Sequence, residues 1–165
     1  MIKSEKMILR NLKELFRNHR NSIQKVLGYA AEPEVYKRLR KANIKHHIQP
    51  PDSEVDVLVY NKKCQIKIIG IRHVGGRHKD KNKVQLCMRH SGDEKAVESY
   101  KTKDIDVFIF VNANHPDLPD VFKIPGKDIF KLQKKNKRES MTKSGYYPTM
   151  VTVSKKDLLK YKWDI

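Results

Sequence analysis

The chain has 165 residues, enough for one compact domain or for one domain with a small appendage. It carries 36 Lys and Arg residues against 19 Asp and Glu residues, so its formal net charge is +17. A positive field of this size attracts polyanions, and nucleic-acid phosphates are the commonest of these. No apolar run approaches the roughly 20 residues that span a bilayer, the first residues lack a signal-peptide core, and Cys64 and Cys87 form no CxxC pair. The composition therefore argues against a membrane protein, a disulfide framework and a zinc ribbon, and we expect a cytoplasmic (intracellular) protein.

Three helices are expected in the first part of the chain. Apolar residues at helical spacing predict the first over residues 4–18. The second covers residues 21–27, and Gly28 is its expected stop. The third has Pro33 in its first turn, where a missing N–H costs nothing, and ends near Asn43.

The pattern changes to strands after Pro50-Pro51. Runs rich in β-branched and aromatic residues predict strands at 56–60, 64–69, 84–88, 107–111, 121–124 and 150–153. The first two should form a hairpin through residues 61–63. We further expect helices at 93–100 and 154–161, the latter capped by Ser154, and a lysine-rich linker at 131–143. This order predicts an α/β (α+β) fold in which helices flank a central mixed β-sheet.

The sharpest chemical pattern lies on the predicted hairpin. Asp56 opens one strand, and Gln65 and Lys67 lie two residues apart on the next, so the latter two share a face that the hairpin can bring beside Asp56. Phosphodiester hydrolysis needs oxygen ligands for Mg²⁺ and gains from a cation close to the developing charge. A carboxylate, an amide oxygen and a lysine would supply these groups, although a solvated strand face gives the same pattern.

The surrounding segments extend this pattern. They are Gly28-Tyr-Ala-Ala-Glu32, then Val35, Leu39 and Ile44, then Asp56-Val-Leu-Val and Gln65-Ile-Lys67, and finally 104–111 and 121–125. Their order and spacing resemble the PD-(D/E)XK nuclease family, in which a helix carrying a Glu precedes the hairpin that bears the Asp and the (D/E/Q)-x-K. The resemblance covers about residues 28–130. It implies a restriction-endonuclease-like core, a Mg²⁺ ion that Mn²⁺ can replace, and a catalytic set of Glu32, Asp56, Gln65 and Lys67, of which the first three are metal ligands.

One departure from the family concerns the third motif, where Gln65 stands in place of an acidic residue. Gln occurs there in some active members, including certain homing and transposition nucleases, so activity is compatible with it. Because one negative charge is lost, metal binding should depend more on Glu32 and Asp56. Asp52 and Glu54 are spare carboxylates nearby.

A second departure is Pro33, directly after the implied ligand Glu32. If the helix begins at Pro33, Glu32 is its cap, and Glu34 becomes the fallback ligand. The two glutamates are two positions apart, about 200° around a helix, so only one of them can face the sheet. The spacing of Glu32 to Val35 and Leu39 matches that of the family, so we prefer Glu32 over Glu34 as the metal ligand.

Two basic segments are expected to contact DNA. The third helix offers Arg38, Arg40 and Lys41, and the glycine-rich loop at 75–83 offers Arg77, Lys79, Lys81 and Lys83. Residues 22–44 are also similar to a helix-turn-helix, with the third helix as the reader and a turn about one residue longer than usual. A helical bundle packed on the sheet would explain the same residues.

These observations lead to two hypotheses of different classes. The first is a Mg²⁺-dependent endonuclease of restriction, homing or junction-resolving type that acts on double-stranded DNA as a homodimer or higher symmetric oligomer, since a short chain has one active site. The alternative, favoured by Gln65, is a non-catalytic DNA-binding protein, either a helix-turn-helix regulator or an inactive nuclease fold. Charge alone leaves RNA open. The expected divisions are a helical extension (1–27), a nuclease-like core (28–130) and a C-terminal segment (131–165).

Overall fold

The computed structural model describes residues 20–51, 53–69, 82–88, 104–112, 115–135 and 150–165. The fold is α+β, as predicted, and its centre is a mixed five-stranded sheet of order β1-β2-β3-β5-β6. The strands are β1 (His46–Ile48), β2 (Val57–Val59), β3 (Lys62–Ile68), β5 (Val107–Val111) and β6 (Val121–Pro125). Only β3 and β5 pair in parallel; the other neighbours within this sheet are antiparallel.

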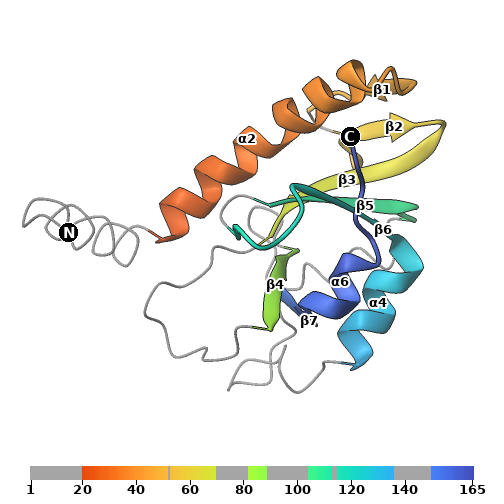
Figure 1. Cartoon of the computed structure of the whole chain (residues 1–165). Coiled ribbons are helices and arrows are strands. Elements are labelled where there is room, and N and C mark those ends of the chain that lie inside the picture. The colour runs from red at the N-terminus through yellow and green to blue at the C-terminus, as the bar shows by residue number, and fades with distance from the viewer. Residues whose placement is uncertain (1–19, 52, 70–81, 89–103, 113–114, 136–149) are drawn as a thin grey trace, which may run out of the picture.

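The sheet lies between two layers (Figure 1). The long helix α2 (Arg20–Lys41) covers one face. The helices α4 (Gly126–Lys135) and α6 (Lys155–Leu159) lie on the other, together with a two-stranded sheet of β4 (Lys83–Cys87) and β7 (Met150–Ser154). Each face therefore has its own apolar core, and β5 is buried along almost its whole length because both of its faces are covered.

The helix α2 is one continuous helix of 22 residues, so the predicted break at Gly28 and the predicted start at Pro33 are wrong. Ala31, Val35 and Leu39, at four-residue spacing, are almost completely buried against the sheet, and this packing outweighs the weak propensity of the glycine. Pro33 is exposed, so the hydrogen bond that it removes lies on the solvent side. Since no turn separates residues 22–28 from residues 35–41, the helix-turn-helix interpretation is also wrong.

The predicted hairpin is confirmed, with a tighter turn than expected. Tyr60 and Asn61 are its two central residues, and both have positive φ values, 49° and 64°. Turns of this type match the right-handed twist of the flanking strands. The edge strand β1 has no counterpart among the predicted strands, because three residues are too few to show a period.

The C-terminal segment is part of the same core. The predicted strands near residues 84–88 and 150–153 pair antiparallel as β4 and β7, and Val151, Val153 and Leu158 are fully buried among the residues of β5 and β6. Ser154 caps α6 as predicted, since its hydroxyl accepts a hydrogen bond from the backbone N–H of Asp157 at 3.0 Å. Residues 131–135, expected to open a linker, complete α4 instead, because Ile129 and Leu132 are buried one turn apart.

Several predictions fall on parts of the chain outside the described residues. They are the helices at 4–18 and 93–100, most of the basic loop with Arg77, Lys79 and Lys81, residues 136–143 of the linker, and Asp52.

Candidate active site

Strand β2 separates from β3 at Asp56. The backbone N–H of Asp56 still donates to the carbonyl of Cys64 at 3.1 Å. Two residues further along β3, the backbone N–H of Ile66 donates to the carboxylate Oδ2 of Asp56 at 2.5 Å. A short acidic side chain at the start of β2 thus replaces a missing strand partner, and this holds the carboxylate against β3.

Gln65 is the second residue of the site and is 4 % exposed. Its amide Nε2 donates to both carboxylate oxygens of Asp56, at 2.9 and 2.8 Å. Its carbonyl Oε1 is buried and has no hydrogen-bond partner within the described part of the chain. A buried acceptor left without a partner costs about 1–3 kcal/mol, so this oxygen can accept a further interaction next to the carboxylate.

Burial raises the pKa of Asp56 from its ordinary value of 3.8 to about 6. The hydrogen bond from Ile66 and the positive charge of Lys67 lower the pKa, and the negative charge of Glu32 raises it further. The ionised form of the Asp56 carboxyl is therefore disfavoured in this site, and a bound cation would stabilise it.

Lys67 lies on the same face of β3 as Gln65. Gln65 pairs with Phe108 of β5 and Lys67 pairs with Phe110, and both phenylalanines pack into the same apolar core on one side of the sheet. Its side chain is half-buried. The positive charge of its ammonium group is close enough to lower the pKa of the Asp56 carboxyl by electrostatic attraction.

Tyr36 connects the helix to this site. Its hydroxyl lies 3.3 Å from Oε2 of Glu32 and 3.3 Å from the backbone oxygen of Asp56. Burial and the two neighbouring negative charges, of Glu32 and then Asp56, raise the pKa of Tyr36 well above its ordinary range. Glu32 is thereby held on the Asp56 side of α2, one helical turn before the tyrosine. Tyr36 was not among the predicted site residues, although its i+4 spacing from Glu32 indicated that the two side chains could meet.

The other glutamate of α2 faces elsewhere. Oε1 of Glu34 accepts a hydrogen bond from Nε of Arg38 at 2.6 Å, one turn further along the helix. Pro33 lies inside the helix, so Glu32 is not a helix cap. Glu54, the spare carboxylate that the structure describes, is exposed.

The donor atoms suit a hard divalent cation. Mg²⁺ prefers carboxylate and amide oxygens, and the side chains of Asp56 and Gln65 supply one of each in direct contact. Glu32 is connected to them only through the hydroxyl of Tyr36, which lies against the backbone oxygen of Asp56. Among the described residues, no group of three His, Cys, Asp or Glu side chains lies together in a way that could hold a metal ion.

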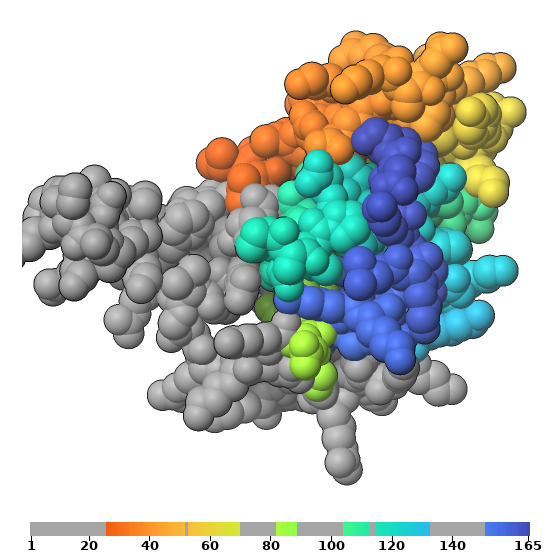
Figure 2. All heavy atoms as spheres, viewed as in Figure 1, coloured from red at the N-terminus to blue at the C-terminus, as the bar shows by residue number. Residues whose placement is uncertain are grey.

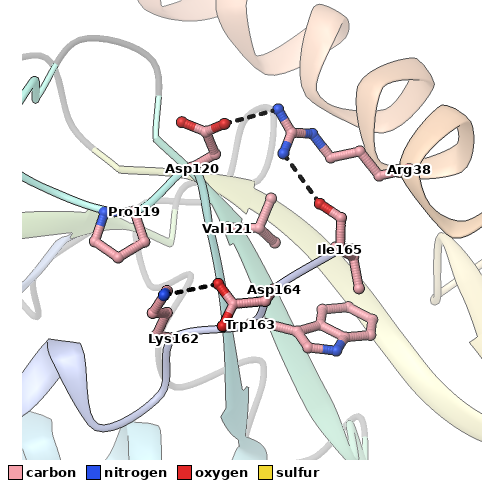
Figure 3. A pocket seen from close by; sticks show the side chains of 8 residues that line it. All are labelled: Arg38, Pro119, Asp120, Val121, Lys162, Trp163, Asp164 and Ile165. Carbon is pink, nitrogen blue, oxygen red and sulfur yellow. Dashed lines mark hydrogen bonds and ion pairs between the residues drawn. The ribbon is translucent and has the colours of Figure 1, made fainter. Parts of the chain in front are cut away.

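The residues predicted to contact DNA have different surroundings. Arg40 and Lys41 are exposed in the last turn of α2, and Lys83 is half-buried at the start of β4. Arg38 is engaged within the protein: besides Glu34, its guanidinium donates to Oδ2 of Asp120 at 3.0 Å and to the backbone oxygen of Ile165 at 3.3 Å (Figure 3).

Arg38 also borders an open hollow of about 520 Å³ between α2 and the last residues of the chain (Figure 3). Lys162, on its rim, pairs with Asp164 at 2.9 Å, and Trp163 lies beneath Lys123 with 4.8 Å between the ammonium nitrogen and the ring centre. Both cations that line the hollow already have carboxylate partners, so it offers little net charge to a phosphate.

A scan against protein-family models gave no match, and a search of the curated proteins found no similar sequence. Within the part of the chain that the structure describes, no helix is both long enough and apolar enough to cross a membrane. The functional assignment therefore depends on the chemistry of the site.

Proposed function

We propose that this protein is a metal-dependent DNA endonuclease of the PD-(D/E)XK type, with Glu32, Asp56, Gln65 and Lys67 as its active site. The observation that carries the proposal is the buried and unpaired Oε1 of Gln65 beside a desolvated carboxylate. Structural packing alone does not explain such a pair, since an apolar residue at position 65 would bury no unsatisfied oxygen.

The chain's own residues have distinct roles in this proposal. Asp56 and the carbonyl of Gln65 hold a Mg²⁺ or Mn²⁺ ion, and Glu32 adds a second negative charge that Tyr36 keeps in position. When bound, the ion polarises the scissile phosphoryl group and lowers the pKa of a water molecule. The ammonium of Lys67 stabilises the negative charge that develops on the phosphate oxygens.

Double-stranded DNA is the substrate that we propose. The formal charge of +17 on 165 residues supports a phosphate-backbone partner. Because one chain supplies one active site, cleavage of both strands requires a homodimer or a higher symmetric oligomer. Restriction, homing and junction-resolving activities would all use this chemistry.

A specific observation also supports a second candidate, a non-catalytic DNA-binding protein that keeps the nuclease fold. The Gln65 amide already donates to both oxygens of Asp56, so the carboxylate has partners without any cation. In this alternative the site is structural and the positive charge alone provides the function.

Nicking of supercoiled plasmid with Mg²⁺, with Mn²⁺ and with EDTA tests the proposal, with linear and branched DNA as further substrates. We expect cleavage that needs the metal ion and that Asp56→Asn abolishes, while Asp104→Asn, which removes the same charge from an exposed carboxylate, keeps it. The second candidate predicts that wild type and Asp56→Asn bind DNA equally well and that neither cleaves it under any metal condition. Calorimetric titration with Mn²⁺ gives an independent readout, in which wild type should bind the ion more tightly than Asp56→Asn.

A further inference from the structure

The turn between β2 and β3 holds an aromatic residue in an unfavourable backbone conformation. Tyr60 has φ = 49°, in the left-handed region that glycine and asparagine tolerate and bulky residues avoid. Its side chain is 61 % exposed, so burial of the ring does not offset the strain. Asn61, the other central residue, suits its own φ of 64°. Folding alone would favour asparagine or glycine at position 60, which points to another use for the ring.

The chain on both sides of this turn is rich in basic residues, and Asp104 and Asp106 are acidic neighbours of Lys63. Residues 40–49 and 57–63 contain no Asp or Glu. They contain five exposed cations, namely Arg40, Lys41, Lys45, Lys62 and Lys63. The backbone N–H of Tyr60 donates to the carbonyl of Lys45 at 3.2 Å, so the backbone of this lysine lies beside the turn, and Lys62 directly follows the turn in the chain. Lys63 is partly neutralised by Asp104, 3.6 Å away.

The turn lies within reach of the active site. Tyr60 follows Asp56 by four positions along β2, which is about 13 Å at about 3.3 Å per residue. A full turn of duplex is about 34 Å, so the two sites are close enough for one DNA molecule to contact both. Figures 1 and 2 show this end of the hairpin at the margin of the molecule, beside the C-terminal end of α2.

We infer that the β2–β3 turn is a contact element for duplex DNA, in which Lys45 and Lys62 bind backbone phosphates and the ring of Tyr60 lies against the duplex between them. This inference rests on the proposed function and adds to it a binding surface outside the active site. Lysines give salt-dependent affinity that is independent of sequence, and an aromatic ring gives apolar contact with sugars and base edges.

The substitution Tyr60→Asn separates a binding role from a structural one. Asparagine tolerates the left-handed conformation, so the variant should unfold about 2–4 °C above wild type. The Kd for a fluorescent 20-base-pair duplex, measured by anisotropy in EDTA, should nevertheless rise about fivefold, the effect of removing one ordinary side-chain interaction. A residue with only a structural role would not give changes of opposite sign in stability and in binding.

A charge variant with a matched control tests the lysines. Lys45→Gln with Lys62→Gln should reduce the slope of log Kd against log salt by up to about 0.9 for each phosphate that the variant no longer binds. Lys127→Gln with Lys156→Gln removes the same charge from exposed positions on α4 and α6, in the layer that lies across the sheet from α2, and should change the slope much less.

The outcomes distinguish this inference from the proposed function. If wild type binds no duplex DNA, both fail together. If wild type binds DNA but Tyr60→Asn leaves the Kd unchanged and Lys45→Gln with Lys62→Gln leaves the salt slope unchanged, only the role of the turn is overturned. A change in oligomeric state on Tyr60→Asn with unchanged DNA affinity would also overturn it, because the ring would then serve a protein contact.

Discussion

Replacing Asp56 with asparagine should make the protein more stable and inactive at the same time. The Asp56 carboxylate is desolvated, and its pKa of about 6 already includes the favourable contributions of Ile66 and Lys67. The variant keeps an oxygen that can accept the N–H of Ile66. Its amide nitrogen can also donate to Oε1 of Gln65 once the Gln65 side-chain amide turns over. That turn moves Nε2 of Gln65 to the buried position without a partner, so the gain in stability comes from removing the buried charge and not from an added hydrogen bond.

The size and the pH range of this effect follow from the pKa of Asp56. A rise from 3.8 to about 6 corresponds to about 3 kcal/mol, since each pKa unit is worth about 1.36 kcal/mol. The folded state holds the proton more tightly than the unfolded state, so the carboxylate lowers stability as the pH rises from about 4 to about 6. This loss in the free energy of unfolding is complete well above pH 6 and absent below about pH 4. The gain of Asp56→Asn should therefore be about 1–3 kcal/mol at pH 8 and close to zero at pH 4.

Urea unfolding in EDTA at pH 8, 6 and 4 measures this gain, with Asp104→Asn as the control for charge. The control removes an exposed carboxylate and should stay within about 0.5 kcal/mol of wild type. Addition of Mn²⁺ should narrow or reverse the difference at pH 8, because the ion stabilises only a protein that binds it. A variant that is less stable than wild type at pH 8, or a gain that does not depend on pH, would refute the reasoning.

Three further substitutions test the other members of the site, and Glu34→Gln is the control for the first of them. Glu32→Gln should lower metal-dependent nicking by about 10–100-fold. Glu34→Gln breaks a partly buried ion pair with Arg38, should cost about 0.5 kcal/mol in urea unfolding and should leave nicking intact. Lys67→Ala should lose most nicking activity and keep duplex affinity within about twofold by anisotropy, since the lysine acts on developing charge; wild-type turnover would remove its assigned role. Gln65→Glu should bind Mn²⁺ more tightly by calorimetry and be less stable in EDTA; an unchanged Mn²⁺ affinity would contradict Gln65 as a ligand.

Most strands of this fold could be predicted because each is a short run of residues that favour strands. The hairpin, β4, β5, β6 and β7 all follow runs of β-branched and aromatic residues. The errors occurred where tertiary packing overrides local preference. Gly28 and Pro33 would break an isolated helix, but the burial of Val35 and Leu39 keeps α2 whole.

The spacing of residues on the hairpin predicted that Gln65 lies close to Asp56, and the structure contains a hydrogen bond between the two side chains. The catalytic role of these residues stays a prediction. Sequence spacing could not show that Tyr36 connects Glu32 to Asp56, because that contact joins residues 20 positions apart across two elements. It also could not show that Arg38 is occupied by Asp120, which lies 82 residues further along the chain.

The choice of glutamine at position 65 has a consequence for how the ion and the DNA bind. The Gln65 amide nitrogen is 2.8–2.9 Å from the oxygens of Asp56, so a carboxylate at position 65 would place two negative charges in contact in a buried site. The amide avoids this repulsion, because it can donate Nε2 to Asp56 without an ion and present Oε1 to one. It also brings one negative charge fewer to the ion, so the affinity of the free protein for Mg²⁺ should be low and a phosphate oxygen of the DNA should complete the ligand set. By linkage, the ion must then tighten DNA binding by the same factor as DNA tightens ion binding. Measuring the duplex Kd in EDTA and in Ca²⁺, for wild type and Asp56→Asn, tests this coupling: equal ion effects in the two proteins would show that the ligands are not shared.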